Sequence, residues 1–116
     1  MRDDVERLRD ILEAIERIEK YAARGRATFD DDELIQTWMV HHIEVIGEAC
    51  RALPEEFQAR YTGVPWSDII GMRNILIHHY FGIDLDAVWL VVERDLPDLK
   101  INVQAILREI GGEDET

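Results

Sequence analysis

The chain has 116 residues, 47% of them apolar and 33% charged, which is enough for one soluble domain and leaves little room for a second. The single cysteine, Cys50, excludes a disulfide framework and a cysteine-based zinc finger. Thirteen basic against 25 acidic residues give a net charge of −12, which argues against a broad basic surface that holds nucleic acid. No apolar run approaches the roughly 20 residues of a membrane span and the N-terminus is charged, so we expect a cytoplasmic protein without a secretory signal.

The charge is unevenly distributed along the chain. Residues 1–26 carry seven basic and seven acidic residues, so their charges balance. The other 90 residues carry six basic and 18 acidic residues. Each arginine in this acidic stretch therefore calls for a structural or functional reason.

The first two predicted helices are separated by a short connector. Apolar residues recur at three- and four-residue steps from Val5 to Ala22, which predicts an amphipathic helix of about 20 residues. Gly25 is suited to its end, and Gly25–Phe29 is predicted to be the connector. A second helix opens on the acidic residues 30–33, which complement its positive N-terminus, and ends at Pro54. Its expected apolar stripe consists of Leu34, Trp38, Val45, Ala49 and Ala52, flanked by Ile35, Ile46 and Leu53.

The remaining helices are predicted after residue 54. Residues 54–65 form a polar loop with room for one helical turn, and a third helix starts near Pro65 and stops by Gly82. Asp84 caps a fourth helix, which Pro97 breaks or kinks before the pattern continues to residue 110. No segment alternates convincingly as a strand. We therefore predict an all-α, up-and-down bundle of four to five helices over residues 1–110, with a flexible acidic tail at 111–116.

The third helix carries the most informative segment, residues 71–82. On a helical wheel Arg73 lies in the middle of the apolar stripe, among Ile69, Ile70, Leu76 and Ile77. An unpaired buried guanidinium is costly, so Arg73 needs either a carboxylate partner or a cleft. The structural alternative is a buried ion pair with Glu44 or Glu48 of the second helix.

Two polar residues accompany Arg73. Asn74 and His78 are four residues apart and share a helix face, whereas Arg73 and His78 would lie roughly 140° apart on a straight helix. Arg73 and His78 converge only if the helix ends near residues 77–79 or if a second chain supplies one of them. A histidine that moves protons beside an arginine that holds a phosphate suits metal-free RNA cleavage, because the 2′-hydroxyl supplies the nucleophile. The structural alternative for His78 is a helix cap or a surface residue.

The sequence also contains candidate residues for metal binding and for thiol chemistry. His41, Glu44 and Glu48 lie along one edge of the second helix, where His78 and His79 could approach them, which raises the possibility of a metal site. The paired Glu-x-x-His elements of a di-iron site are absent, so we expect no metal. Cys50 is expected to be a small core or helix-face residue rather than a nucleophile.

The motif Arg73-x4-His78-x-Tyr80 resembles the signature of the HepT-like toxins of the HEPN superfamily. These are small all-helical ribonucleases paired with a minimal nucleotidyltransferase antitoxin. The resemblance covers nearly the whole chain, and its further motifs are Ile46-Gly47-Glu48-Ala49, Pro65-Trp66, Ile70-Gly71-Met72-Arg73-Asn74, Tyr80-Phe81-Gly82-Ile83-Asp84, Val88-Trp89 and Asp95-Leu96-Pro97.

The resemblance implies a role for each matching residue. Arg73 and His78 look like the catalytic pair of a metal-independent endoribonuclease without a cofactor, and Asn74 looks like a supporting polar residue. The family works as a homodimer whose two motifs line one cleft. Tyr80 matches the tyrosine that the antitoxin modifies with AMP. His79 stands where many relatives carry Asp and adds a second imidazole, but His78 remains the favoured catalytic histidine.

The resemblance favours the toxin of a type VII toxin–antitoxin system, with RNA as substrate and His79, Glu44 and Glu48 as supporting residues. The acidic surplus beyond residue 26 is expected to help dock the antitoxin. The alternative is a non-catalytic acidic helical module that binds a basic partner, in which Arg73 is a structural ion-pair residue. Nucleotide binding without cleavage is a remote third possibility, because the chain has no glycine-rich phosphate loop.

Overall fold

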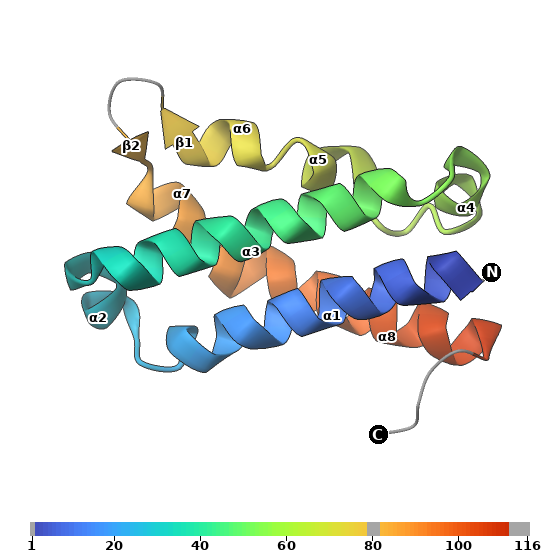
Figure 1. Ribbon diagram of the computed structural model, residues 1–116, viewed down its shortest axis with the longest axis horizontal. Coiled ribbons are helices and arrows are strands. Elements are labelled where there is room, and N and C mark those ends of the chain that lie inside the picture. The colour runs from blue at the N-terminus through green and yellow to red at the C-terminus, as the bar shows by residue number, and fades with distance from the viewer. Residues whose placement is uncertain (1, 79–81, 112–116) are drawn as a thin grey trace.

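Three long helices, α1, α3 and α8, form the body of the molecule (Figure 1). The computed structural model describes residues 2–78 and 82–111, and over these residues it confirms the predicted all-α class. Helix α1 packs against both α3 and α8, while α5 and α6 pack on α3. The elements are α1 (Arg2–Ala22), α2 (Arg26–Asp31), α3 (Glu33–Ala52), α4 (Glu55–Arg60), α5 (Trp66–Ile70), α6 (Arg73–Leu76), β1 (Ile77–His78), β2 (Gly82–Ile83), α7 (Leu85–Leu90), the π-helical turn η1 (Val91–Asp95) and α8 (Leu96–Ile110).

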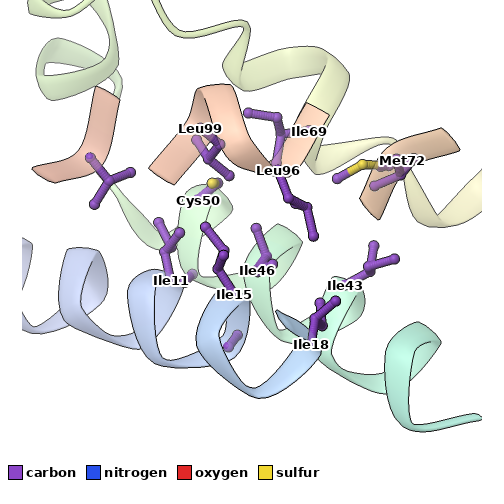
Figure 2. Close-up of a cluster of buried hydrophobic side chains, with 14 of the residues drawn as sticks. Ile11, Ile15, Ile18, Ile43, Ile46, Cys50, Ile69, Met72, Leu96 and Leu99 are labelled. Atoms are coloured by element: carbon purple, nitrogen blue, oxygen red, sulfur yellow. The ribbon is translucent and has the colours of Figure 1, made fainter. Parts of the chain in front are cut away.

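The core is an apolar seam between α1 and α3. Side chains of α1 at three- and four-residue spacing are fully buried, as the amphipathic pattern predicts: Leu8, Ile11, Ile15 and Ile18. Figure 2 shows part of this row facing α3, with residues of the α5–α6 segment and of α8 closing the cluster: Ile11, Ile15 and Ile18; Ile43, Ile46 and Cys50; Ile69 and Met72; Leu96 and Leu99. Burial of each such Ile or Leu contributes about 1.5–3 kcal/mol, so this seam is the main source of stability.

The start of α3 differs from the sequence prediction in two ways. The predicted connector Gly25–Phe29 falls largely within helix α2, which follows Gly25 at a φ of 92°. Helix α3 starts at Glu33 because the Asp32 side chain accepts hydrogen bonds from the N–H groups of Leu34 and Ile35, at 2.9 and 3.2 Å. The predicted stripe was also wrong at Leu34, which is 81% exposed. The core-facing row of α3 is displaced by one position and includes Ile35, Met39, Ile43, Ile46 and Cys50.

The predicted third helix is interrupted. It consists of α5 and α6, separated by Gly71 and Met72, and the chain then turns into β1 and β2. At the break, the N–H of Met72 donates to the Ile69 carbonyl at 3.2 Å and the N–H of Asn74 donates to the Gly71 carbonyl at 3.0 Å. These three-residue hydrogen bonds are tighter than the α-helical pattern and end its ladder. The prediction of one helix from Pro65 to Gly82 was therefore wrong.

The last helical run matches its predicted cap but not its predicted break. The Asp84 side chain accepts from the Ala87 N–H at 3.0 Å and caps α7, as expected. Before Pro97 the chain widens into the π-helical turn η1, and the N–H of Leu96 donates to the Val91 carbonyl. Because Pro97 has no N–H to continue the α-helical ladder, a wider turn accommodates it without a break. Pro97 then stands in the first turn of α8.

Two sequence expectations concern the ends and the environment of the chain. Of the predicted tail 111–116, only Gly111 lies within the described residues. No helix in the described part of the chain is both long and apolar enough to cross a lipid bilayer.

Cys50 is fully buried in the α1–α3 seam, and burial raises the pKa of its thiol to about 12. At pH 8 only roughly one such thiol in 10,000 is ionised. We expect native protein to resist an aromatic disulfide reagent and to react stoichiometrically once unfolded in guanidinium chloride. The absorbance of the aromatic thiolate released by the reagent gives the reaction rate of the native and of the unfolded protein. Labelling of native protein as fast as that of a free cysteine derivative would contradict this buried placement.

Candidate functional site

The segment that carries the predicted catalytic residues lies where α6 gives way to the β1–β2 pair. Arg73 is the first residue of α6, and Asn74 follows it and is exposed. His78 is the last residue of β1, not a residue of a helix. His79 and Tyr80 lie outside the described residues. The end of α6 at Leu76 meets the first of the two conditions set above for bringing Arg73 and His78 together.

Backbone hydrogen bonds hold both ends of this segment. His78 pairs with Gly82 and Ile77 pairs with Ile83 in the antiparallel register of β1 and β2. The N–H of Asp84 donates to the Leu76 carbonyl at 2.7 Å, next to the cap that begins α7. The backbone of His78 is therefore fixed relative to two helices, although the residue itself is in neither.

A depression of about 210 Å³ between α3 and the α5–α6 segment brings several of the predicted residues together. Asn74 lines it together with Glu44 and Glu48, two carboxylates of α3 that were predicted to support the site. Glu44 is half-buried and Glu48 is exposed. An amide and two carboxylates at one hollow form a polar site that can donate and accept hydrogen bonds.

Close approach of two helices forms the floor of this depression. A Cβ at Gly47 would lie 3.5 Å from the Ile69 carbonyl oxygen and 3.6 Å from that of Ile70, which is ordinary van der Waals contact. A methyl group would fit there without a shift, so α5 lies about as close to α3 as a Cβ at this position allows. The small residue at position 47 thus accompanies the close packing that brings Asn74 to one hollow with Glu44 and Glu48.

Arg51 was not among the predicted site residues. It lies in the last turn of α3, is exposed, lines the same depression and makes no ion pair with the residues that the structure describes. Its spacing offered a signal. Arg51 comes three residues after Glu48 and seven after Glu44, and residues at these spacings lie on the same side of a helix. Arg51 brings to the depression a planar cation that can bind phosphate with two hydrogen bonds.

The metal alternative receives no support from the arrangement of α3. His41 opens onto a different hollow of about 300 Å³, which it shares with Arg7 and Asp10 of α1. Glu44 and Glu48 line both hollows and form the ridge between them. Within residues 2–78 and 82–111, no three histidine, cysteine or acidic side chains gather closely enough to hold a metal ion.

Comparison with known proteins adds the family context. A family model described as "Ribonuclease HepT-like" matches residues 11–106. A Methanocaldococcus jannaschii protein named "Gamma-glutamylcyclotransferase and putative RNase" is 42% identical over 112 residues, which are 95% of this chain but 50% of that protein. The "Probable ribonuclease HepT" of Thermococcus cleftensis is 38% identical over 96 residues, covering 80% of this chain and 86% of the relative. No solved structure matches the chain significantly.

These relatives differ in length. This chain spans half of the first M. jannaschii protein. It covers 90% of a second protein from that organism, named "Putative RNase", at 39% identity over 111 residues. Each of these two matches spans more than nine-tenths of this chain.

Replacing Arg73 with alanine separates a structural from a functional arginine. A broken buried ion pair with Glu44 or Glu48 would lower the free energy of unfolding by about 3–5 kcal/mol. We expect a loss below about 1 kcal/mol, as for an arginine that faces a cleft. Urea unfolding followed by circular dichroism gives the value, and Arg51→Ala is the matched control because Arg51 is exposed and makes no ion pair with the described residues. A loss of 3 kcal/mol or more for Arg73→Ala would favour the structural alternative.

Proposed function

Because this chain belongs to the HepT-like ribonuclease family, we propose that it cleaves RNA at the segment from Arg73 to Tyr80. The observation that carries the proposal is the position of the Arg73-x4-His78-x-Tyr80 motif inside the matched region, residues 11–106. The end of α6 at Leu76 supports it, because a continuous helix would hold positions 73 and 78 on different faces.

The proposed reaction uses the RNA's own 2′-hydroxyl. His78 removes the proton from this hydroxyl, whose oxygen attacks the adjacent phosphorus. The bond from phosphorus to the 5′-oxygen breaks, and that oxygen leaves with a proton from a second acid. Arg73 binds the phosphate and the charge that develops on its oxygens. The products are a 2′,3′-cyclic phosphate and a 5′-hydroxyl, and the reaction requires no metal ion.

Asn74 and Arg51 are suited to bind the RNA beside the scissile bond. Both line the depression between α3 and the α5–α6 segment, where an amide and a guanidinium offer several hydrogen-bond donors. If the depression lacked these donors, Glu44 and Glu48 would repel a phosphate that entered it. Their role in the proposal is to orient the cations and to accept hydrogen bonds from the hydroxyl or amino groups of the substrate.

The active form is proposed to be a homodimer. A chain with a net charge of −12 cannot hold RNA by general attraction, because affinity for the phosphate backbone depends on the number of cations in contact with it. Two copies that share one cleft double the number of arginines and histidines at the scissile phosphate. One His78 then serves as base and the other as acid.

We further propose that the protein is the toxin of a type VII toxin–antitoxin pair. A minimal nucleotidyltransferase antitoxin would transfer AMP from ATP to the Tyr80 oxygen and release pyrophosphate. Tyr80 is two residues from His78 in the sequence, so the adduct would place a bulky anion beside the proposed catalytic residue. This anion would compete with the RNA phosphate for Arg73.

A second candidate function, a non-catalytic acidic module that binds a basic partner, is favoured by the net charge alone. Catalysis distinguishes the two functions. The acidic module would leave RNA intact, whereas the ribonuclease would cut it in the presence of a chelator.

Changing His78 to alanine should lower the rate of RNA cleavage by at least about 100-fold, because general acid–base catalysis contributes that much or more. The assay follows end-labelled RNA in EDTA and identifies the cyclic phosphate end by its resistance to phosphatase. The control His41→Ala removes an exposed histidine of the other hollow and should keep full activity. Sedimentation should show the same oligomer for both variants. Cleavage by His78→Ala at the wild-type rate would contradict the assignment.

Tyr80 should be the site of AMP transfer. After incubation with a minimal nucleotidyltransferase and ATP, mass spectrometry should show one or more AMP units on the wild-type chain, which should then no longer cleave RNA. Tyr80→Phe should gain no mass. Tyr61→Phe is the matched control and should be modified normally, since its hydroxyl donates to Glu109 at 3.1 Å, away from the motif. Modification that persists in Tyr80→Phe would show that another residue is the acceptor.

A further inference from the structure

A third hollow, larger than the two described above, lies on the other side of α5. It is a groove of about 400 Å³ between α5 on one side and η1 and α8 on the other. Ile69 lines both this groove and the depression that contains Asn74, so α5 separates the two. Of the residues proposed to bind RNA, neither Asn74 nor Arg51 lines the groove.

The floor of the groove is apolar. Ile69 and Met72 from the α5–α6 segment, Leu99 from α8 and Val91 of η1 all line it. Figure 2 shows Ile69 between Leu99 and Met72. Ile101 lines the groove as well and is 63% exposed, although most large apolar side chains of this chain are buried. Ile101 thus adds exposed apolar surface at the edge of the apolar floor.

The rim of the groove is acidic. Asp68, Asp95 and Asp98 line it and are exposed, and none of them makes an ion pair with a residue that the structure describes. No lysine or arginine whose side chain the structure describes lines the groove. Lys100, next in sequence to two lining residues, instead donates to Glu19 of α1 at 2.9 Å. The described part of the chain thus supplies no counter-charge to the three carboxylates around the groove.

We propose that this groove binds a basic amphipathic segment of a partner protein. The segment would lay apolar side chains on Ile69, Met72 and Leu99 and place lysine or arginine near the three aspartates. RNA does not fit, because the carboxylates would repel its phosphates. A second copy of this chain does not fit either, because its net charge of −12 would place acidic surface against the three aspartates.

The groove is adjacent to the proposed catalytic segment. Met72 lines the groove and directly precedes Arg73, so a bound segment would contact the backbone that leads into α6. The inference does not rest on RNA cleavage, because the groove, its apolar floor and its acidic rim are properties of other residues.

The test uses the full chain and an 18-residue fluorescent peptide of leucine and lysine, arranged with one apolar and one basic helix face. Fluorescence anisotropy measures its affinity. The triple variant Asp68→Asn, Asp95→Asn, Asp98→Asn should weaken binding by about tenfold, because it removes three ion pairs. The control variant Glu16→Gln, Asp31→Asn, Glu56→Gln changes the net charge equally at exposed acids outside the groove and should weaken binding less than about twofold. Urea unfolding verifies that both variants are folded.

A second pair of variants tests the apolar contact. Ile101→Ser should weaken peptide binding by about fivefold, whereas Leu34→Ser, which alters an even more exposed side chain outside the groove, should leave it unchanged. Amide chemical shifts should change at residues 63–72 and 91–102 when the peptide is added.

Three outcomes would overturn the proposal. Equal losses in the two charge variants would show attraction to the net charge instead of to the groove. Self-association that Ile101→Ser abolishes would make the groove an interface between copies of this chain. Amide shifts in the groove on addition of a single-stranded RNA oligonucleotide would make it a nucleic-acid surface. All of these experiments measure binding. A negative result would therefore not bear on the proposed RNA cleavage, and a finding that the protein does not cleave RNA would not affect this test.

Discussion

The close contact between α3 and α5 at Gly47 is the constraint on which the depression at Asn74 and the groove on the other side of α5 depend. The carbonyl oxygens of Ile69 and Ile70 lie within ordinary van der Waals distance of where a Cβ of residue 47 would stand, so the two helices are packed closely here. Held there, α5 turns its buried Ile69 into the core and leaves a depression on one side and a groove on the other. A helix held farther from α3 would merge these hollows and expose apolar surface of the seam.

Much of the fold could be predicted because its signals are local. The spacing of apolar residues in α1, the end of α3 before Pro54 and the cap at Asp84 depend on residues a few positions apart, and the structure contains all three. The break at Gly71 and Met72 could not be predicted, because it depends on contacts that fix α5 on α3 and on Met72 reaching the core. A wheel drawn through residues 65–82 therefore assumed a straight helix that tertiary packing does not allow.

The candidate site was predictable in part for the same reason. The motif predicts Asn74, and the spacing along one edge of the second helix predicts Glu44 and Glu48. These three residues line one depression because the helices that carry them pack face to face. The spacing of Arg51 from Glu44 and Glu48 places it on the same side of α3, but whether the depression extends to Arg51 depends on where the α5–α6 segment lies along α3. His78 was expected on a helix, whereas the pairing of Gly82 with His78 places it in extended backbone.

The π-helical turn η1 allows one continuous helical segment to pack on two different parts of the molecule. A π turn contains an extra residue, so residues after it are rotated by roughly 100° compared with an unbroken α-helix. Before the turn α7 packs on α3 and α6, and after it α8 packs on α1. Without the π-helical turn, the helix would present to α1 the same face that it presents to α3 and α6. The phase change thus joins the half of the molecule that carries the motif to the half that holds the long helices, with no loop between them.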